Sequence, residues 1–171
     1  MTEIHGTCTP EFEAVRTTFA ANFDKGLEQG ACVSVTHHGE TVVDLWAGQA
    51  ADDRPWEADT ICNVWSTTKT MAATVMLMLA DQGLIDLDAP VATYWPEFAA
   101  NGKEGVLVRH VLGHTAGLPG WNPGITGETL YDWDATCANL AAQATWWEPG
   151  TQAGYHALSQ GYLEGEIVRR V

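Results

Sequence analysis

The stretch WSTTKTMAATVMLMLADQG, residues 65–83, sets a serine and a lysine three positions apart at the start of an almost unbroken apolar run. Residues three apart on a helix share a face, so the side chains of Ser66 and Lys69 can reach each other. The run continues to Gly83, which predicts a helix over residues 66–82. Since this helix is apolar on nearly every side, we expect it to be buried all round.

A serine and a lysine in this arrangement can form a nucleophile and its base. The serine hydroxyl is a weak nucleophile until a base removes its proton, and a lysine partly stripped of water loses its own proton more readily. The helix N-terminus adds backbone N–H groups and positive potential that stabilise an oxyanion. With three serines and three lysines in 171 residues, chance gives about 0.05 such pairs. The alternative is that Ser66 caps the helix and Lys69 is a surface residue.

The composition favours a soluble globular protein that binds neither nucleic acid nor membrane. The chain is 46% hydrophobic and 18% charged, which provides for one sizeable core. Its formal net charge of -14 would repel phosphate backbones and anionic lipid. The longest apolar run, residues 71–80, is too short to span a bilayer. The first residues show no pattern of a secretory signal, so we expect a cytoplasmic location.

The cysteines and histidines do not indicate a metal site. Cys8, Cys32, Cys62 and Cys137 stand at wide, irregular intervals, which predicts free thiols. Neighbouring histidines at 37 and 38 would point to opposite faces of a strand and could not hold one metal together. We expect the protein to need no metal or organic cofactor.

Periodicity and turn residues place the remaining elements. Residues 10–26 predict an amphipathic helix, residues 31–48 a hairpin, and residues 84–171 a mostly helical region. Within that region one long helix is expected over residues 127–147 and another over the last residues. A lone hairpin is marginal as a sheet, so we expect that more chain belongs to this single domain.

Three motifs in order resemble those of the penicillin-recognising serine hydrolases. Ser66-Thr67-Thr68-Lys69 resembles their S-x-x-K motif. RHVLGHTAGLP, residues 109–119, is similar to the L-x-H-x-[AS]-G-L segment of class C β-lactamase-like proteins, and WEPGTQAGYHALSQGYLEGEIVRRV, residues 147–171, to their W-x-P-G and Y-x-x segment. The similarity runs from about residue 10 to the last residue and is closest to the family VIII carboxylesterases.

The resemblance implies a fold and a set of site residues. The fold is the β-lactamase/transpeptidase-like α/β (α+β) type, an antiparallel sheet flanked by helices plus a mostly helical region. Tyr155 takes the place of the family's general base beside Ser66 and Lys69; a phenol with a reference pKa near 10 needs a neighbouring cation for that task. His114 is expected to be structural, since a lysine already supplies the base. Residues expected to contact substrate are Trp65, Trp121 and His156.

The chain departs from the family after Tyr155. The family's third motif, K-T-G or a W-G-G or H-G-G variant, lies on a later strand that also supplies an oxyanion-hole N–H, and nothing after Tyr155 can be that strand. We therefore expect residues 1–171 to be the N-terminal portion of a catalytic domain, with a C-terminal fragment of the same protein as a second chain.

The resulting functional hypothesis is a serine carboxylesterase that hydrolyses small-molecule acyl esters through a Ser66 acyl-enzyme. Two alternatives remain open. One is a β-lactamase or D-Ala-D-Ala peptidase that uses the same residues on an amide bond. The other is a non-catalytic β-lactamase-like binding module.

Overall fold

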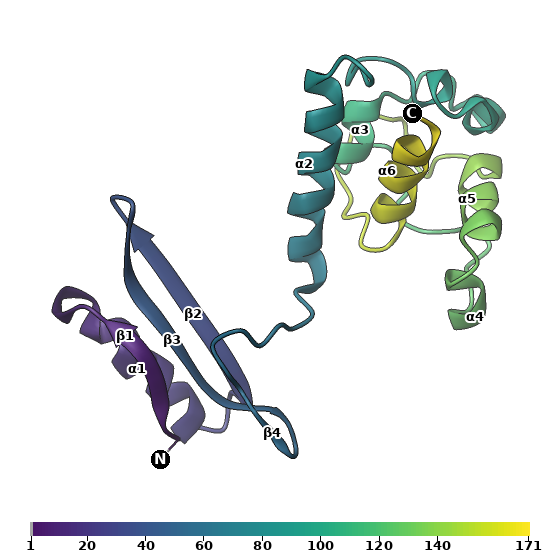
Figure 1. Cartoon of the computed structure of the whole chain (residues 1–171). Coiled ribbons are helices and arrows are strands. Elements are labelled where there is room, and N and C mark those ends of the chain that lie inside the picture. The colour runs from purple at the N-terminus through teal and green to yellow at the C-terminus, as the bar shows by residue number, and fades with distance from the viewer. Residues whose placement is uncertain (1) are drawn as a thin grey trace. The chain divides into compact units, whose positions relative to one another are not determined.

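The computed structural model describes residues 2–171, which divide after Asn63 into two compact units (Figure 1). The first, the sheet unit, is an antiparallel sheet with one helix, and the second, the helical unit, is built from helices and 3-10 turns. This combination confirms the predicted α/β class. The assignment of both units to a single domain stays a prediction.

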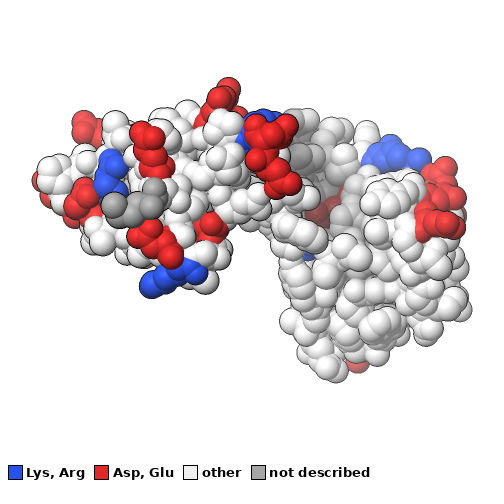
Figure 2. Space-filling view, turned by 90° about the horizontal axis from the view of Figure 1, so that it is seen from below, with Lys and Arg blue, Asp and Glu red and all other residues white. Residues whose placement is uncertain are grey.

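Two surface properties follow from the described residues. Figure 2 shows many acidic and few basic side chains on the face in view, as a formal net charge of -14 requires. None of the helices in residues 2–171 combines the length and the apolarity that crossing a bilayer demands.

The sheet unit contains, within residues 2–63, four antiparallel strands in the order β1-β3-β2, with β4 paired to β3. Their bounds are β1 Ile4–Cys8, β2 Gly30–His37, β3 Glu40–Ala51 and β4 Arg54–Pro55. Strands β2 and β3 form the predicted hairpin. It turns through His38 and Gly39, which both have the positive φ that a two-residue hairpin turn requires.

Strand β1 is an addition to the two strands that the sequence predicts. It is short, and Gly6 at its centre weakens the alternating pattern by which strands are found. Gly6 has a φ of 96°, and a Cβ there would lie 2.0 Å from the carbonyl oxygen of Asp44. The close pairing of β1 with β3 therefore requires glycine at this position.

Helix α1, Glu13–Asp24, covers one face of the sheet and confirms the helix predicted over residues 10–26 (Figure 1). A 3-10 turn at Pro10–Phe12 leads into it. Phe19 and Phe23 on α1 are buried and belong to one apolar cluster with Val43, Leu45 and Ala47 of β3. Burial of these side chains holds the helix on the sheet.

The helical unit is organised around a second apolar cluster that includes Trp95, Phe98, Leu118 and Leu163. Its helices are α2 Thr68–Asp81, α3 Val108–Leu112, α4 Gly127–Leu130, α5 Trp133–Ala142 and α6 Ser159–Arg170, with 3-10 segments at Trp65–Thr67, Val91–Thr93 and Pro96–Gly102.

The single long helix predicted over residues 127–147 is wrong, since α4 and α5 are separate. Asp132 starts α5 anew, because its Oδ1 accepts a hydrogen bond from the N–H of Ala135 at 3.0 Å. Such a side-chain cap satisfies an N–H that would otherwise lack a partner at the start of a helix.

Within the helical unit, the expectation that the helix over residues 66–82 is buried all round is also wrong. Within the described residues of α2, Met76 is the buried one. By contrast, the side chains of Met71, Val75, Leu77 and Met78 are 43% to 65% exposed. Helix α6 packs against α2, and Met76 joins the core of the helical unit, so that unit covers α2 on one side only.

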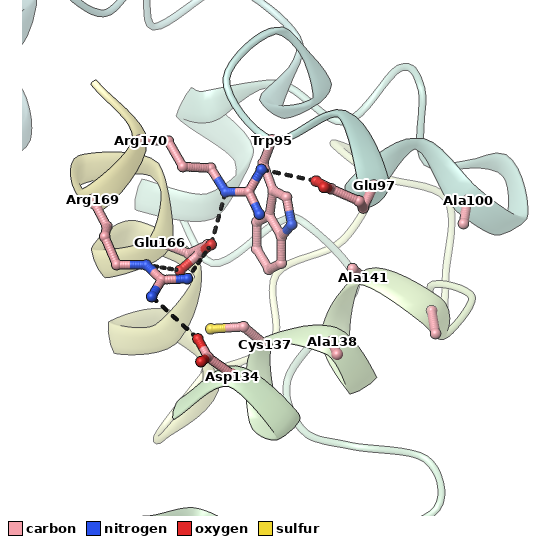
Figure 3. A pocket seen from close by; sticks show the side chains of 11 residues that line it. Trp95, Glu97, Ala100, Asp134, Cys137, Ala138, Ala141, Glu166, Arg169 and Arg170 are labelled. Atoms are coloured by element: carbon pink, nitrogen blue, oxygen red, sulfur yellow. Dashed lines mark hydrogen bonds and ion pairs between the residues drawn. The ribbon is translucent and has the colours of Figure 1, made fainter. Parts of the chain in front are cut away.

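Helix α6 is tied to its surroundings by Glu166, whose side chain is only 1% exposed (Figure 3). Its carboxylate accepts hydrogen bonds from Trp133 Nε1 at 2.9 Å and from Arg170 Nε at 2.7 Å, and it pairs with Arg169 at 2.9 Å. Burial by itself would raise the pKa of Glu166, but the hydrogen bonds from these three side chains outweigh it and hold the pKa at about 2. The group lines a pocket of about 400 Å³.

We predict that Glu166→Gln lowers the free energy of unfolding by about 2 kcal/mol at pH 7, a modest value because both arginines are partly exposed. The pKa of Glu166 falls from 4.5 to about 2 on folding. Its contribution is therefore fully present above pH 4.5 and is lost as the pH falls from 4.5 towards 2. Urea denaturation of both proteins at pH 7 and pH 3 measures this, and an equal difference at the two pH values would contradict it.

Candidate active site

Ser66 lies on the 3-10 turn Trp65–Thr67 that leads into α2, where its side chain is exposed. The preceding residue, Trp65, has a left-handed φ of 48°. This conformation costs a non-glycine residue roughly 1–2 kcal/mol. Strained backbone of this kind is concentrated at functional sites, so the turn that presents Ser66 is a candidate for one.

Lys69, on the first turn of α2, connects Ser66 to a distant loop. Its Nζ donates to Ser66 Oγ at 3.5 Å and to the carbonyl of Ala157 at 2.7 Å. The same Nζ lies 5.2 Å from the ring centroid of Tyr155, within the range of a cation–π contact. The Nζ–Oγ contact is long, as catalytic hydrogen bonds often are before substrate binds. The structure thus brings together the three predicted catalytic residues, Ser66, Lys69 and Tyr155.

The loop that carries Tyr155 is supported by His114. The carbonyl of His114 accepts from the N–H of Gly154 at 3.0 Å, and its Nδ1 accepts from the N–H of His156 at 3.1 Å. Its ring also packs against the ring of Tyr155, with centroids 4.9 Å apart. His114 therefore holds the backbone on both sides of Tyr155.

His156 is a second support of the same loop. It is fully buried, its Nε2 accepts from the N–H of Leu118 at 3.1 Å, and its Nδ1 is hydrogen-bonded to the carbonyl of Gly154. Because Nε2 accepts, the proton lies on Nδ1 and the imidazole is neutral. Burial lowers the pKa of His156 and of His114, and the positive charge of Lys69 lowers the pKa of His114 further.

The three predicted substrate-binding residues differ in their exposure. Trp65 is 81% exposed beside Ser66. Trp121 is 9% exposed within the core, where its Nε1 donates to the carbonyl of Thr136 at 3.2 Å. His156 is fully buried. Contact of these side chains with substrate stays a prediction.

Glu164 on α6 belongs to the site, although the sequence does not indicate it. Its side chain is 2% exposed, and its two carboxylate oxygens have no hydrogen-bond partner among residues 2–171. Burial raises the pKa of Glu164 to about 7, and the charge of Lys69 opposes the rise. Together with Lys69 it lines a pocket of about 170 Å³, whose other residues are Thr68, Ala72, Ala157, Leu158 and Gly161. In the sequence Glu164 looks like any acidic residue on a surface helix, since its burial comes from contacts with distant residues.

Comparisons with known proteins agree with the motifs. The family model described as Beta-lactamase matches residues 19–171. The protein named Esterase/beta-lactamase LipL from Mycobacterium tuberculosis (strain ATCC 25618 / H37Rv) is 43% identical, over 98% of this chain and 39% of its own.

Two solved structures are similar over almost the whole chain. A family VIII carboxylesterase has a TM-score of 0.88 at 54% identity, over 98% of this chain and 46% of its own. A penicillin-binding protein homologue from Caulobacter crescentus has a TM-score of 0.92 at 46% identity, over 99% of this chain and 46% of its own. The chain thus spans less than half the length of the relatives it matches.

We predict that lowering the pH from 7.5 to 5.5 loosens the loop around Tyr155. The pKa of His114 and that of His156 lie below the ordinary value of 6.5 in the folded chain. Above pH 6.5 both are neutral whether or not the chain is folded. As the pH falls below 6.5, the unfolded chain takes up protons that the folded chain resists, and stability is lost.

The variant His114→Asn isolates this effect, because an amide oxygen can accept from the N–H of His156 without titrating. The free energy of unfolding, measured by urea titration at pH 7.5 and 5.5, should fall less in the variant than in the parent. An equal fall in the two proteins would contradict the role of His114.

Proposed function

The chain belongs to the beta-lactamase family, and on that basis we propose that it carries the nucleophile of a serine carboxylesterase that hydrolyses small acyl esters. The observation that carries the proposal is the position of Lys69 Nζ, 3.5 Å from Ser66 Oγ and 5.2 Å from the ring centroid of Tyr155. The names of two relatives, an esterase/beta-lactamase and a family VIII carboxylesterase, support the substrate class.

The proposed reaction begins when Lys69 and Tyr155 take the proton of Ser66 and its Oγ attacks the carbonyl carbon of the ester. Backbone N–H groups at the start of α2 stabilise the oxyanion that forms. The bond to the alcohol oxygen then breaks as that oxygen receives the proton, which leaves the acyl group on Ser66. Water attacks the acyl carbon and gives a proton to the same base. The acid leaves as Ser66 regains its proton. No step draws on a metal or an organic cofactor.

A β-lactamase or a D-Ala-D-Ala peptidase is the second candidate, because the same three residues could act on an amide bond. The name of the M. tuberculosis relative includes both esterase and beta-lactamase, and one similar structure is a penicillin-binding protein homologue. However, β-lactamases of this type commonly have Ser and Asn after the tyrosine, where this chain has His156 and Ala157. The ring nitrogens of His156 are both engaged within the chain, and Ala157 has no polar side chain. The loop therefore offers an amide substrate fewer hydrogen bonds, which favours an ester.

We also propose that a C-terminal segment of the family fold, called here the complementing segment, completes the site as a second chain. The face of α2 that the helical unit leaves uncovered, with Met71, Val75 and Met78, supports this proposal, because proteins in water rarely leave a contiguous apolar patch of large side chains uncovered. The segment of the family VIII carboxylesterase that follows its matched part is a suitable probe.

We predict that a p-nitrophenyl phosphonate labels Ser66 when the chain is co-expressed with the complementing segment. Ser66→Ala should reduce the labelling rate by at least about 10³-fold, because the attacking oxygen is lost. Intact-mass measurement and peptide mapping locate the adduct. Ser34→Ala, which alters an exposed serine of β2, is the matched control and should label like the parent. Persistent labelling of Ser66→Ala would refute the acyl-enzyme.

We predict that p-nitrophenyl acetate and butyrate are hydrolysed with a kcat/KM at least about tenfold above that for nitrocefin. The assay compares the chain alone with the chain bound to the complementing segment. The reverse order of substrates would favour the β-lactamase, and a folded complex inactive on all three would favour a binding module. An active 18.5 kDa monomer would contradict the need for a second segment.

A further inference from the structure

Glu164 is a buried carboxyl that the reaction proposed above does not use. It lies on α6, which packs against α2, and it lines the same pocket as Lys69. Neither oxygen has a hydrogen-bond partner among residues 2–171. An unpartnered buried carboxyl is costly for a folded protein, and such groups are concentrated where their ionisation is used.

Glu166, a second buried glutamate on α6, has a structural role and differs from Glu164 in its hydrogen-bond partners. Two positions along α6 correspond to a rotation of roughly 200°, so Glu164 and Glu166 point to different sides of the helix. Glu166 is bound by two arginines and a tryptophan, whereas Glu164 faces a pocket. Because no hydrogen bond from the described residues fixes its charge, Glu164 can exchange a proton where Glu166 cannot.

The side chains of Glu164 and Lys69 line the same pocket, which has room for water between them. Its volume of about 170 Å³ is several times the roughly 30 Å³ that one water occupies in the liquid. Gly161, one turn before Glu164, also lines the pocket, and a Cβ at that position would enter open space, with nothing within 4 Å. Ala72 and Ala157 line the pocket with short side chains. Bridging water and protons therefore have room between Glu164 and Lys69.

The charged groups of α3 and α5, which also pack against α6, are engaged elsewhere, and Asp81 lies at the opposite end of α2 from Lys69. On α3, Arg109 pairs with Asp88, and the Nδ1 of His110 accepts from the N–H of Leu107. On α5, Asp134 pairs with Arg169 on the far side of α6. Among the described residues, Lys69 is the charge that acts on the ionisation of Glu164.

We propose that Glu164 is a positioning residue of the Ser66 site, a buried carboxyl whose charge state beside Lys69 sets the pH range in which the site accepts the serine proton. The inference rests on the proposed function. While Glu164 is neutral, it does not oppose proton release from the catalytic base. Once ionised, it stabilises the ammonium of Lys69. A negative charge disfavours the loss of a proton from a neighbouring group, so the direction of the effect on Ser66 labelling is the same whether Lys69 or Tyr155 is the base.

The test is the pH profile of Ser66 labelling by a p-nitrophenyl phosphonate, from pH 5 to 9, in the parent and in Glu164→Gln. Both are co-expressed with the complementing segment. Since the pKa of Glu164 is about 7, the two profiles should coincide below about pH 6. Above pH 7 the variant should reach a given rate roughly one pH unit lower, up to about tenfold faster at the same pH. Coincident profiles across the whole range would overturn the inference.

Glu166→Gln is the matched control, because it removes the charge of a second buried carboxyl on the same helix. It should change stability and leave the shape of the pH profile unaltered. A shift equal to that of Glu164→Gln would assign the effect to net charge and overturn the inference. If Ser66 is labelled but the pH profiles of parent and Glu164→Gln coincide, the role of Glu164 is contradicted and the proposed function is not. If Ser66 is labelled in none of the proteins, both the proposed function and the role of Glu164 are contradicted.

The melting temperature gives a second readout that needs no activity. The pKa of Glu164 rises from 4.5 to about 7 on folding, so its ionisation destabilises the folded chain increasingly as the pH rises from 4.5 to 7. Glu164→Gln should therefore raise the melting temperature by several degrees at pH 8 and by progressively less towards pH 4.5. A gain that does not depend on pH would contradict the titration of Glu164.

Discussion

The hydrogen bond from Lys69 Nζ to the carbonyl of Ala157 joins parts of the chain 88 residues apart. One partner lies on the first turn of α2, next to Ser66, and the other lies two residues after Tyr155. The same Nζ also contacts Ser66 Oγ and the face of the Tyr155 ring. The hydroxyl of Ser66, the amino group of Lys69 and the side chain of Tyr155 therefore lie close together. The relation between α2 and the tyrosine loop depends on this lysine.

The two buried glutamates of α6 show how environment assigns different tasks to the same side chain. On α6, hydrogen bonds from arginines hold the pKa of Glu166 at about 2, while burial raises that of Glu164 to about 7. The first carboxylate is a permanent charge that anchors the helix. Glu164 can change its charge near neutral pH, and it lines the same pocket as Lys69, a base proposed to accept the proton of Ser66. His114 and His156 are kept neutral, and their ring nitrogens serve as hydrogen-bond acceptors that hold the loop.

Local patterns in the sequence are sufficient to predict the elements that are determined by neighbouring residues. The helix over residues 10–26, the hairpin and the three-residue spacing of Ser66 and Lys69 belong to this group, and the predicted trio with Tyr155 does lie together. Features set by distant contacts are different. Strand β1 exists because Gly6 fits against Asp44 of β3. The start of α5 has a local cause instead, because Asp132 accepts from the N–H of Ala135, but the apolar spacing over residues 127–147 conceals this break. The burial of Glu164 depends on the packing of α6 on α2, for which no short stretch of sequence carries a signal. The apolar run of α2 shows how much surface can be buried, but not that the helical unit covers only one side of it.

In the mechanism we propose, Lys69 holds Ser66 and Tyr155 in one reactive arrangement. A crystal structure of the phosphonate adduct with the complementing segment bound tests this arrangement most directly, and we expect it to show a covalent bond from Ser66 Oγ to phosphorus. We also expect Lys69 Nζ within hydrogen-bond distance of both that oxygen and the carbonyl of Ala157, and the ring of Tyr155 still against Nζ. A phosphonate bonded to another residue, or Lys69 turned away from Ser66 in the adduct, would contradict this mechanism.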